Sequence, residues 1–275
     1  MPVIIRKIDH VANKVSSGCD IIHLLNRGVT GNDQIILDYI KLASGSDYDV
    51  KLDNGAVGWI QLLSGTGTFD GTSEILSSNL ISYLPQGFQA RYASGKRGSE
   101  LLIAQIPNAN RFDSDIKKMP KNLRHTDWTR EPILESEHDA RKRVYMATSA
   151  LAGTNAFKGE MITYPPGTAA PEHHHIGAEH FQYIISGHIT ALLNGDRQEL
   201  EAGDILYNYE NELHTFINES NAEAKFVEFF VPGPCETVWS PGANVCAWLP
   251  TGIDSEGRKP ARDIAYHIHG QDEGL

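Results

Sequence analysis

Short apolar runs broken by turn residues are the feature that most limits what this chain can fold into. Runs rich in β-branched and aromatic residues, such as residues 59–63 and 226–231, end at clusters of Gly, Asn, Asp or Pro. A spacing of about 8–12 residues between such runs is typical of β-sandwiches and β-barrels. Helical periodicity is weak, and we expect it only around residues 17–25 and 139–145. The sequence therefore predicts an all-β fold.

Length and charge limit the possible partners. The chain has 275 residues, enough for one large domain or two of ordinary size, and a formal net charge of −11. An acidic chain is a poor partner for nucleic acid or an anionic membrane, because both require clustered Lys and Arg. No apolar run approaches the roughly 20 residues of a membrane span, and the N-terminus does not resemble a signal peptide. We expect a cytoplasmic protein with a small-molecule substrate and three reduced cysteines.

Histidines in the second half carry the strongest chemical signal. His173 and His175 are two residues apart, so on a strand their side chains face the same way, while His174 faces the opposite way. A tight turn at residues 176–178 would return His180 to their side, and His214 can join them from a third strand. Imidazoles at this spacing suit Zn(II), Fe(II), Ni(II) or Cu(II) and leave coordination positions open.

This stretch resembles the first motif of the cupin superfamily. That motif runs Gly, five residues, His-x-His, four residues, an acidic residue, six residues, Gly, and the chain keeps every spacing from Gly167 to Gly187. The acidic position holds His180, and Glu179 comes one residue earlier. A slip of one residue on a strand turns a side chain to the other face, so we predict His180 as the fourth ligand and Glu179 outward. A bulge at the turn would reverse this assignment.

The second cupin motif is partly kept. Gly203, His214 and Asn218 match it, while Tyr209 and Asn211 replace its Pro and Gly. The resemblance thus implies a metal held by His173, His175, His180 and His214.

The remaining histidines lack such a context. His267 and His269 share the His-x-His spacing but have no third ligand near them in the sequence, so surface or packing roles are expected. The same expectation applies to His10, His23, His125, His138 and His188.

The two-part template also fits the first half of the chain, offset by 122 residues in the first motif and 124 in the second. Its ligand positions hold Lys51, Asp53, Gly58 and Ala90, which cannot make a conventional metal site. We expect Lys51 and Asp53 to face the cavity of this barrel and pair there; an anion or substrate pocket is the alternative. The resemblance therefore implies a bicupin: two cupin barrels, of the double-stranded β-helix or jelly-roll type, in one chain.

The predicted organisation has four segments. Residues 1–107 form a cupin without metal ligands, residues 108–145 a connector, residues 146–238 a metal-binding cupin, and residues 239–275 a tail packed on the barrels. Phe181, Tyr183 and Ile185 would give one strand an apolar outer face. That face predicts a homodimer, unless the first cupin covers it.

The reaction is less constrained than the fold, because cupins host many chemistries. Four histidines leave the metal without a negative protein ligand, so it stays a stronger Lewis acid than with the usual Glu. All-histidine cupin sites are similar to Fe(II) dioxygenases and to some zinc cyclases and lyases. The resemblance implies one divalent metal per chain, Fe(II) by preference with Zn, Mn or Ni as alternatives.

A mononuclear Fe(II) dioxygenase of a small organic substrate is the preferred function. The alternatives are a redox-inert zinc or manganese lyase, isomerase, cyclase or aminohydrolase, and a non-catalytic cupin that binds a small ligand. Strand parity predicts that Gln182 and Phe216 line the cavity and bind substrate, although Gln182 could instead satisfy a buried polar neighbour. The sequence assigns no catalytic residue.

Overall fold

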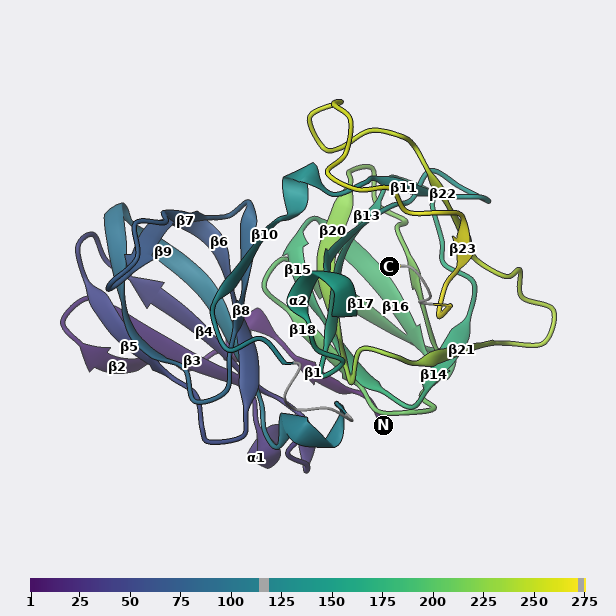
Figure 1. Cartoon of the computed structure of the whole chain (residues 1–275). Helices are drawn as coiled ribbons and strands as arrows, with labels where there is room; N and C mark the ends of the chain where they lie inside the picture. Colours follow the sequence, from purple (N-terminus) through teal and green to yellow (C-terminus); the bar gives the residue numbers. More distant parts are fainter. Residues whose placement is uncertain (114–118, 272–274) are drawn as a thin grey trace. The chain divides into compact units, whose positions relative to one another are not determined.

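The computed structural model describes residues 1–113, 119–271 and 275, and almost all regular structure in them is β-strand. The chain divides into two compact units (Figure 1). The C-terminal unit comprises residues 1–8, 129–150 and 157–275, and the N-terminal unit comprises residues 9–128 and 151–156. The predicted all-β fold is confirmed.

The N-terminal unit is an antiparallel sheet of order β10-β8-β6-β9-β4-β3-β2, in which β5 pairs with β9 and β7 with β6. Its core is apolar and includes Ile60, Leu62, Phe69 and Tyr92. The strands are β2 (Asn13–Ser16), β3 (Cys19–Leu25), β4 (Ile36–Leu42), β5 (Asp47–Lys51), β6 (Val57–Phe69), β7 (Leu76–Ser77), β8 (Leu80–Leu84), β9 (Gln89–Ile106) and β10 (Arg124–Asp127).

The C-terminal unit has two sheets, of order β1-β18-β15-β20-β13-β12-β11-β22-β23 and β17-β16-β19-β14-β21. Side chains of both sheets, among them Ile184, Leu193, Phe216 and Phe226, form one apolar cluster. The strands are β1 (Val3–Ile5), β11 (Leu134–Ser136), β12 (Lys142–Ala147), β13 (Lys158–Tyr164), β14 (His173–Ile176), β15 (Glu179–Ser186), β16 (His188–Leu193), β17 (Asp196–Glu201), β18 (Ile205–Asn208), β19 (His214–Ile217), β20 (Ala224–Val231), β21 (Glu236–Trp239), β22 (Ala247–Pro250) and β23 (His267–Ile268).

Helices are short. Among the described residues, α1 (Arg27–Thr30) and α2 (Ser149–Ala152) are α-helices of four residues each. Single 3₁₀ turns span Lys7–Asp9, Ala109–Arg111 and Trp128–Arg130. Within the described residues, no helix is long and apolar enough to cross a membrane.

Glycines at equivalent places show the internal repeat. Gly65 and Gly187, which close the first motif in each half, have φ of 79° and 80°. A side chain cannot replace either glycine without strain, because a Cβ would lie 2.1 Å from the Gly98 carbonyl oxygen at the first and 2.5 Å from the Glu223 carbonyl oxygen at the second. Both halves thus make the same turn for the same steric reason.

The two helical segments expected from the sequence are strands instead. Residues 19–25 form β3, and most of residues 139–145 lies in β12. In β3 the buried Cys19 and Ile21 alternate with the less buried Asp20 and Ile22, the period of two that a strand requires. Pairing with β4 and β13 outweighs the weak helical spacing.

The chain is grouped differently from the four predicted segments. Strand β1, at the N-terminus, pairs with β18 and so lies in the C-terminal unit. The predicted connector supplies β10 to the N-terminal unit and β11 and β12 to the C-terminal unit. The tail supplies β22 and β23, which extend the sheet beyond β11 (Figure 1).

Two further expectations concern the cysteines and the apolar residues of β15. None of the three cysteines forms a disulfide, as predicted. Phe181 and Tyr183 are buried within this chain, so they do not offer the apolar outer face from which a homodimer was expected. The homodimer stays a prediction.

The expected placement of Lys51 and Asp53 inside the first barrel is wrong. Both side chains are exposed, and the neighbouring Val50 and Leu52 enter the apolar core instead. Apolar and charged residues alternate along β5, and burial of the apolar set fixes the register. Asp53 bonds Gln105, whose Nε2 lies 2.8 Å from Asp53 Oδ2. Lys51 and Asp53 line a pocket of about 130 Å³, and its use by a ligand stays a prediction.

We expect Asp53→Ala to leave metal content unchanged, because in the part of the chain that the structure describes this exposed carboxylate belongs to no group of potential metal ligands. Metal analysis of the purified variant checks this, with His173→Ala as the metal-poor control. A stoichiometry of two that falls to one in Asp53→Ala would contradict it.

Candidate metal centre

Three strands bring the four predicted histidines together. His173 and His175 are on β14, and His173 pairs directly with His214 of β19. Between β14 and β15 the chain turns at Gly177, whose φ of 88° suits glycine. The turn places His180 near the start of β15.

These histidines form a buried cluster. Each is between 1% and 7% exposed. The ligand atoms of His175, His180 and His214 all lie within 4.8 Å of one another. The ring of His173 lies 4.5 Å from that of His214 and 4.9 Å from that of His175, between ring centroids. The geometry therefore gathers all four side chains at one place.

Hydrogen bonds orient the ring nitrogens. Nδ1 of His173 lies 2.8 Å from the Pro171 carbonyl oxygen, and Nδ1 of His214 lies 2.9 Å from that of Glu212. A carbonyl oxygen only accepts, so each Nδ1 carries the hydrogen and each Nε2 of the neutral ring has a free lone pair. A metal ligand needs that lone pair.

The other two rings have unsatisfied nitrogens. Nε2 of His175 and both nitrogens of His180 are buried without a hydrogen-bond partner among the described residues. Leaving buried polar atoms unpaired costs free energy, and such atoms call for an explanation such as a bound ion. A divalent metal would bind Nε2 of His175 and one nitrogen of His180, so the residues present fit the metal that the sequence predicts.

Burial also keeps the imidazoles neutral. Burial, followed by the neighbouring histidines, lowers the pKa of His175 and His180 well below the usual value. Burial has the same effect on His173, and it lowers the pKa of His214 to about 4 against an opposing hydrogen bond to Glu212. Neutral rings need not lose a proton before they bind a metal.

Glu179 lies on the opposite face of β15 from His180. It is partly exposed, and its carboxylate accepts a hydrogen bond from the Tyr207 hydroxyl. This is the arrangement that strand parity predicts. The choice of His180 over Glu179 as the fourth ligand stays a prediction, now with the side-chain directions in its favour.

A buried carboxyl that the sequence analysis missed lies beside His180. Oε1 of Glu228 is 3.6 Å from His180 Nε2. Burial and the adjacent Glu160 raise the pKa of Glu228 to about 8, against the opposing charge of Arg143. Glu228 is the one charged residue within the apolar segment 226–231, and this pattern could have indicated a buried carboxyl from the sequence.

Gln182 is satisfied by protein groups at both ends. Its Nε2 donates to Glu228, and its Oε1 accepts from Asn208 Nδ2 at 3.1 Å. These bonds match the alternative prediction for Gln182, that it satisfies buried polar neighbours. Its role in substrate binding stays a prediction.

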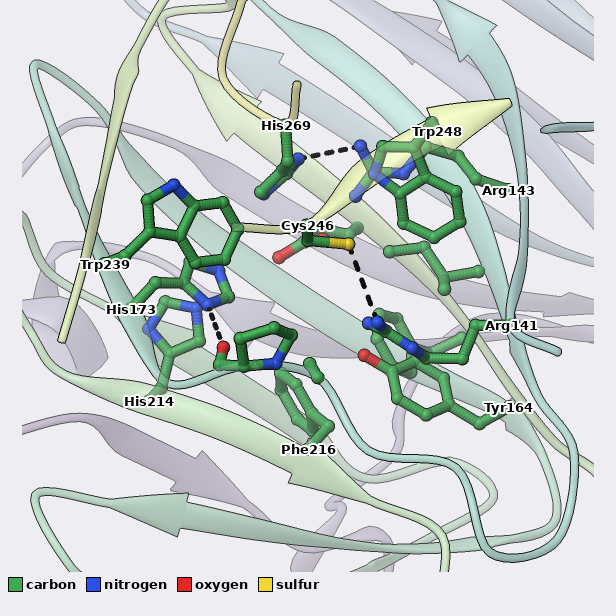
Figure 2. A pocket seen from close by; sticks show the side chains of 15 residues that line it. Arg141, Arg143, Tyr164, His173, His214, Phe216, Trp239, Cys246, Trp248 and His269 are labelled. Carbon is green, nitrogen blue, oxygen red and sulfur yellow. Dashed lines mark hydrogen bonds between the residues drawn. The ribbon is translucent and has the colours of Figure 1, made fainter. Parts of the chain in front are cut away.

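A small cavity opens from the cluster. Phe216 lines it, as predicted, beside Trp239 and Trp248 (Figure 2). Its volume is about 20 Å³, small beside a typical ligand pocket. Further lining residues include Arg141, Arg143, His173, His214 and His269.

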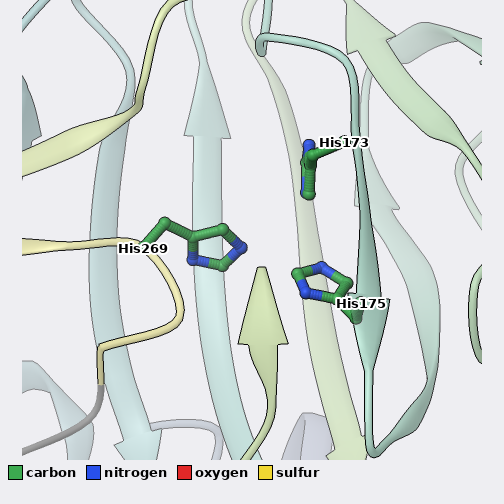
Figure 3. A group of neighbouring side chains, drawn as sticks. All are labelled: His173, His175 and His269. Carbon is green, nitrogen blue, oxygen red and sulfur yellow. The ribbon is translucent and has the colours of Figure 1, made fainter. Parts of the chain in front are cut away.

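His269 corrects the expectation that the tail histidines have no potential ligand nearby. It is buried, and its ring lies 5.4 Å from that of His173 and 5.2 Å from that of His175 (Figure 3). The second His-x-His pair was the sequence signal. Only the pairing of β23 with β22 shows that the tail returns to this site.

Sequence comparison finds a known domain in the part of the chain that holds the four histidines. The profile of the cupin domain matches residues 160–230. The tetracenomycin polyketide synthase protein TcmJ of Streptomyces glaucescens is 28% identical over 85 residues, which cover 31% of this chain and 56% of that protein. The match thus spans little more than half of that relative.

Structure comparison extends to both units. Oxalate decarboxylase from Bacillus subtilis at pH 4.6 superposes with a TM-score of 0.68 at 15% identity, over 86% of this chain and 78% of that chain. A single-residue variant of the same enzyme gives a TM-score of 0.68 at 14% identity, over 86% and 79%. Residues 160–230 thus match a cupin domain, and the fold of the chain is similar to that of a bicupin enzyme. At this identity the likeness establishes the fold of the bicupin and leaves its reaction open.

Proposed function

We propose that this bicupin is a mononuclear metal enzyme of a small organic substrate, and that its reaction is an Fe(II)-dependent dioxygenation. One observation carries the proposal: four neutral, buried imidazoles converge, and the groups of potential ligand atoms found among the described residues consist of histidines. His173, His175, His180 and His214 would hold the metal. Bound Fe(II) would supply redox chemistry with dioxygen.

The chain's own residues would bind the substrate and exclude water. Phe216, Trp239 and Trp248 give the cavity apolar walls. Excluding water strengthens the polar interactions made inside such a site. The buried Glu228, which accepts a hydrogen bond from Gln182, lies 3.6 Å from His180 Nε2 and lines the same cavity.

Oxalate decarboxylation is not the reaction we propose. The solved structures carry that name, and one is described for its Mn(II) centres, but the likeness at 15% identity is one of fold. Oxalate-type cupins are expected to have a carboxylate as the fourth metal ligand, whereas this chain has His180 at that position. That change favours a more electrophilic centre.

Oxygen uptake by defined metal forms tests the proposal. The protein is freed of metal with a chelator and loaded with one equivalent of Fe(II), Zn(II) or Mn(II) without air. Each form is then offered a panel of small carboxylates, enols and diketones. We expect dioxygen consumption only with Fe(II) and a substrate.

The outcomes separate the alternatives. Substrate turnover by the Zn(II) or Mn(II) form without dioxygen would favour the lyase, isomerase, cyclase or aminohydrolase group. Tight binding of a panel compound without turnover by any form would favour a ligand-binding cupin.

A further inference from the structure

The C-terminal tail adds a fifth histidine to the cluster. Strand β22 pairs with β11, and β23 pairs with β22, which places His267 opposite Trp248. The backbone amide of His269 then donates to the Cys246 carbonyl oxygen at 3.0 Å. These contacts tie residue 269 to the wall of the cavity.

The ring of His269 meets its neighbours edge-on. Its plane makes angles of 89° with that of His173 and 82° with that of His175, and Figure 3 shows it directed between them. His173, His175 and His269 have nitrogens within 4.8 Å of one another. By distance alone, the three could form a second metal triad.

Its hydrogen bond argues for a different role. Nη1 of Arg143 lies 2.7 Å from Nδ1 of His269. A guanidinium has donors only, so Nδ1 must accept and the hydrogen of the neutral ring must be on Nε2. His173 and His214 have the opposite tautomer, with Nδ1–H donated to carbonyl oxygens. His269 therefore presents an N–H where those two present lone pairs.

Arg143 is itself held in place. Its Nη2 lies 3.1 Å from Glu160 Oε1, its Nη1 donates to the Tyr145 hydroxyl at 3.2 Å, and its guanidinium stacks 4.2 Å from the Trp248 ring centroid. With both partners buried, the tautomer of His269 is fixed by the fold.

We propose that His269 is a positioning residue, whose Nε2–H donates a hydrogen bond to a carboxylate oxygen of the small molecule bound at the histidine cluster. This rests on the proposed metal centre. The cavity lining includes two guanidinium groups, of Arg141 and Arg143, and one carboxyl, of Glu228, whose pKa is raised to about 8. This balance of charge favours an anionic ligand, and the volume of about 20 Å³ favours a small one. The tail thus contributes to ligand recognition and leaves metal binding to the other four histidines.

The test uses Co(II) as the metal and acetate as the probe. Acetate can place one oxygen on the metal and offer the other to His269, whereas chloride has no second acceptor atom. Both are titrated into the Co(II)-loaded protein, and binding is followed by the visible Co(II) spectrum. We expect His269→Leu to keep Co(II) and chloride affinity but to weaken acetate by roughly tenfold or more, as for a lost hydrogen bond to a charged group.

Two further variants make the result specific. His269→Gln retains an N–H at the end of its side chain and should recover part of the acetate affinity. His188→Gln is the control: this exposed histidine is not among the residues that line the cavity, and its replacement should leave acetate binding unchanged.

Three outcomes would count against these ideas in different ways. Loss of Co(II) from a folded His269→Leu protein would make His269 a ligand and overturn the inference. Equal acetate affinity in His269→Leu and the unmodified protein would also overturn it. Failure of the unmodified protein to bind Co(II) would overturn the metal centre on which the inference rests.

Discussion

His180→Ala is expected to weaken metal binding by about 10–100-fold or more, while Glu179→Gln leaves it unchanged. Mutating a residue that hydrogen-bonds a metal ligand typically weakens metal affinity by this factor, so removal of the ligand itself should weaken it at least as much. His180 is buried, and its two nitrogens have no hydrogen-bond partner in the described residues, whereas the Glu179 carboxylate is partly exposed and bonded to Tyr207. Equilibrium dialysis of both variants with Zn(II) and Fe(II) measures the difference.

A third variant probes the charge of the site. His180→Glu should keep about one metal per chain and change turnover, because a carboxylate lowers the net positive charge of the metal. The reverse result, with metal lost in Glu179→Gln and kept in His180→Ala, would show that the ligand set contains a carboxylate. The all-histidine ligand set that favours a dioxygenase would then be wrong.

The metal-free protein is expected to lose stability steeply as the pH falls below about 6.5. Burial sets the pKa of His173, His175, His180 and His269 well below the usual 6.5, and that of His214 to about 4. Between these values the unfolded chain binds more protons than the folded one, so acid favours unfolding. Each histidine contributes up to about 1.4 kcal/mol per pH unit.

One group acts in the opposite direction. The pKa of Glu228 is raised to about 8, so the folded state holds that proton where the unfolded state has lost it, and acid stabilises the fold through this group. A single carboxyl does not offset five imidazoles. The net effect below pH 6.5 is destabilising.

Urea unfolding of chelator-treated protein at pH 7.5, 6.5 and 5.5 measures the effect. His180→Leu should have a shallower pH dependence, since one buried titrating ring is removed. His188→Gln is the control, because that ring is exposed and lies outside the buried cluster. Equal free energies of unfolding at pH 7.5 and 5.5 would refute the expectation.

The sequence by itself determined the strand-rich fold, the repeat and the shared direction of three histidines. His173, His175 and His180 lie within eight residues, so strand parity and the Gly177 turn orient them locally. Spacing within a strand and the conformational demands of turns are properties of short segments. Such properties can be predicted without knowing the partners of each strand.

Tertiary structure decided which distant residues join the site and which face some strands bury. His269 and Glu228 reach the cluster only through the pairing of β23 with β22 and of β20 with β15. Lys51 stays exposed because burying Val50 and Leu52 stabilises the opposite register. Pairings between remote segments depend on the apolar surface that the whole chain leaves to be covered, and no local spacing contains that information.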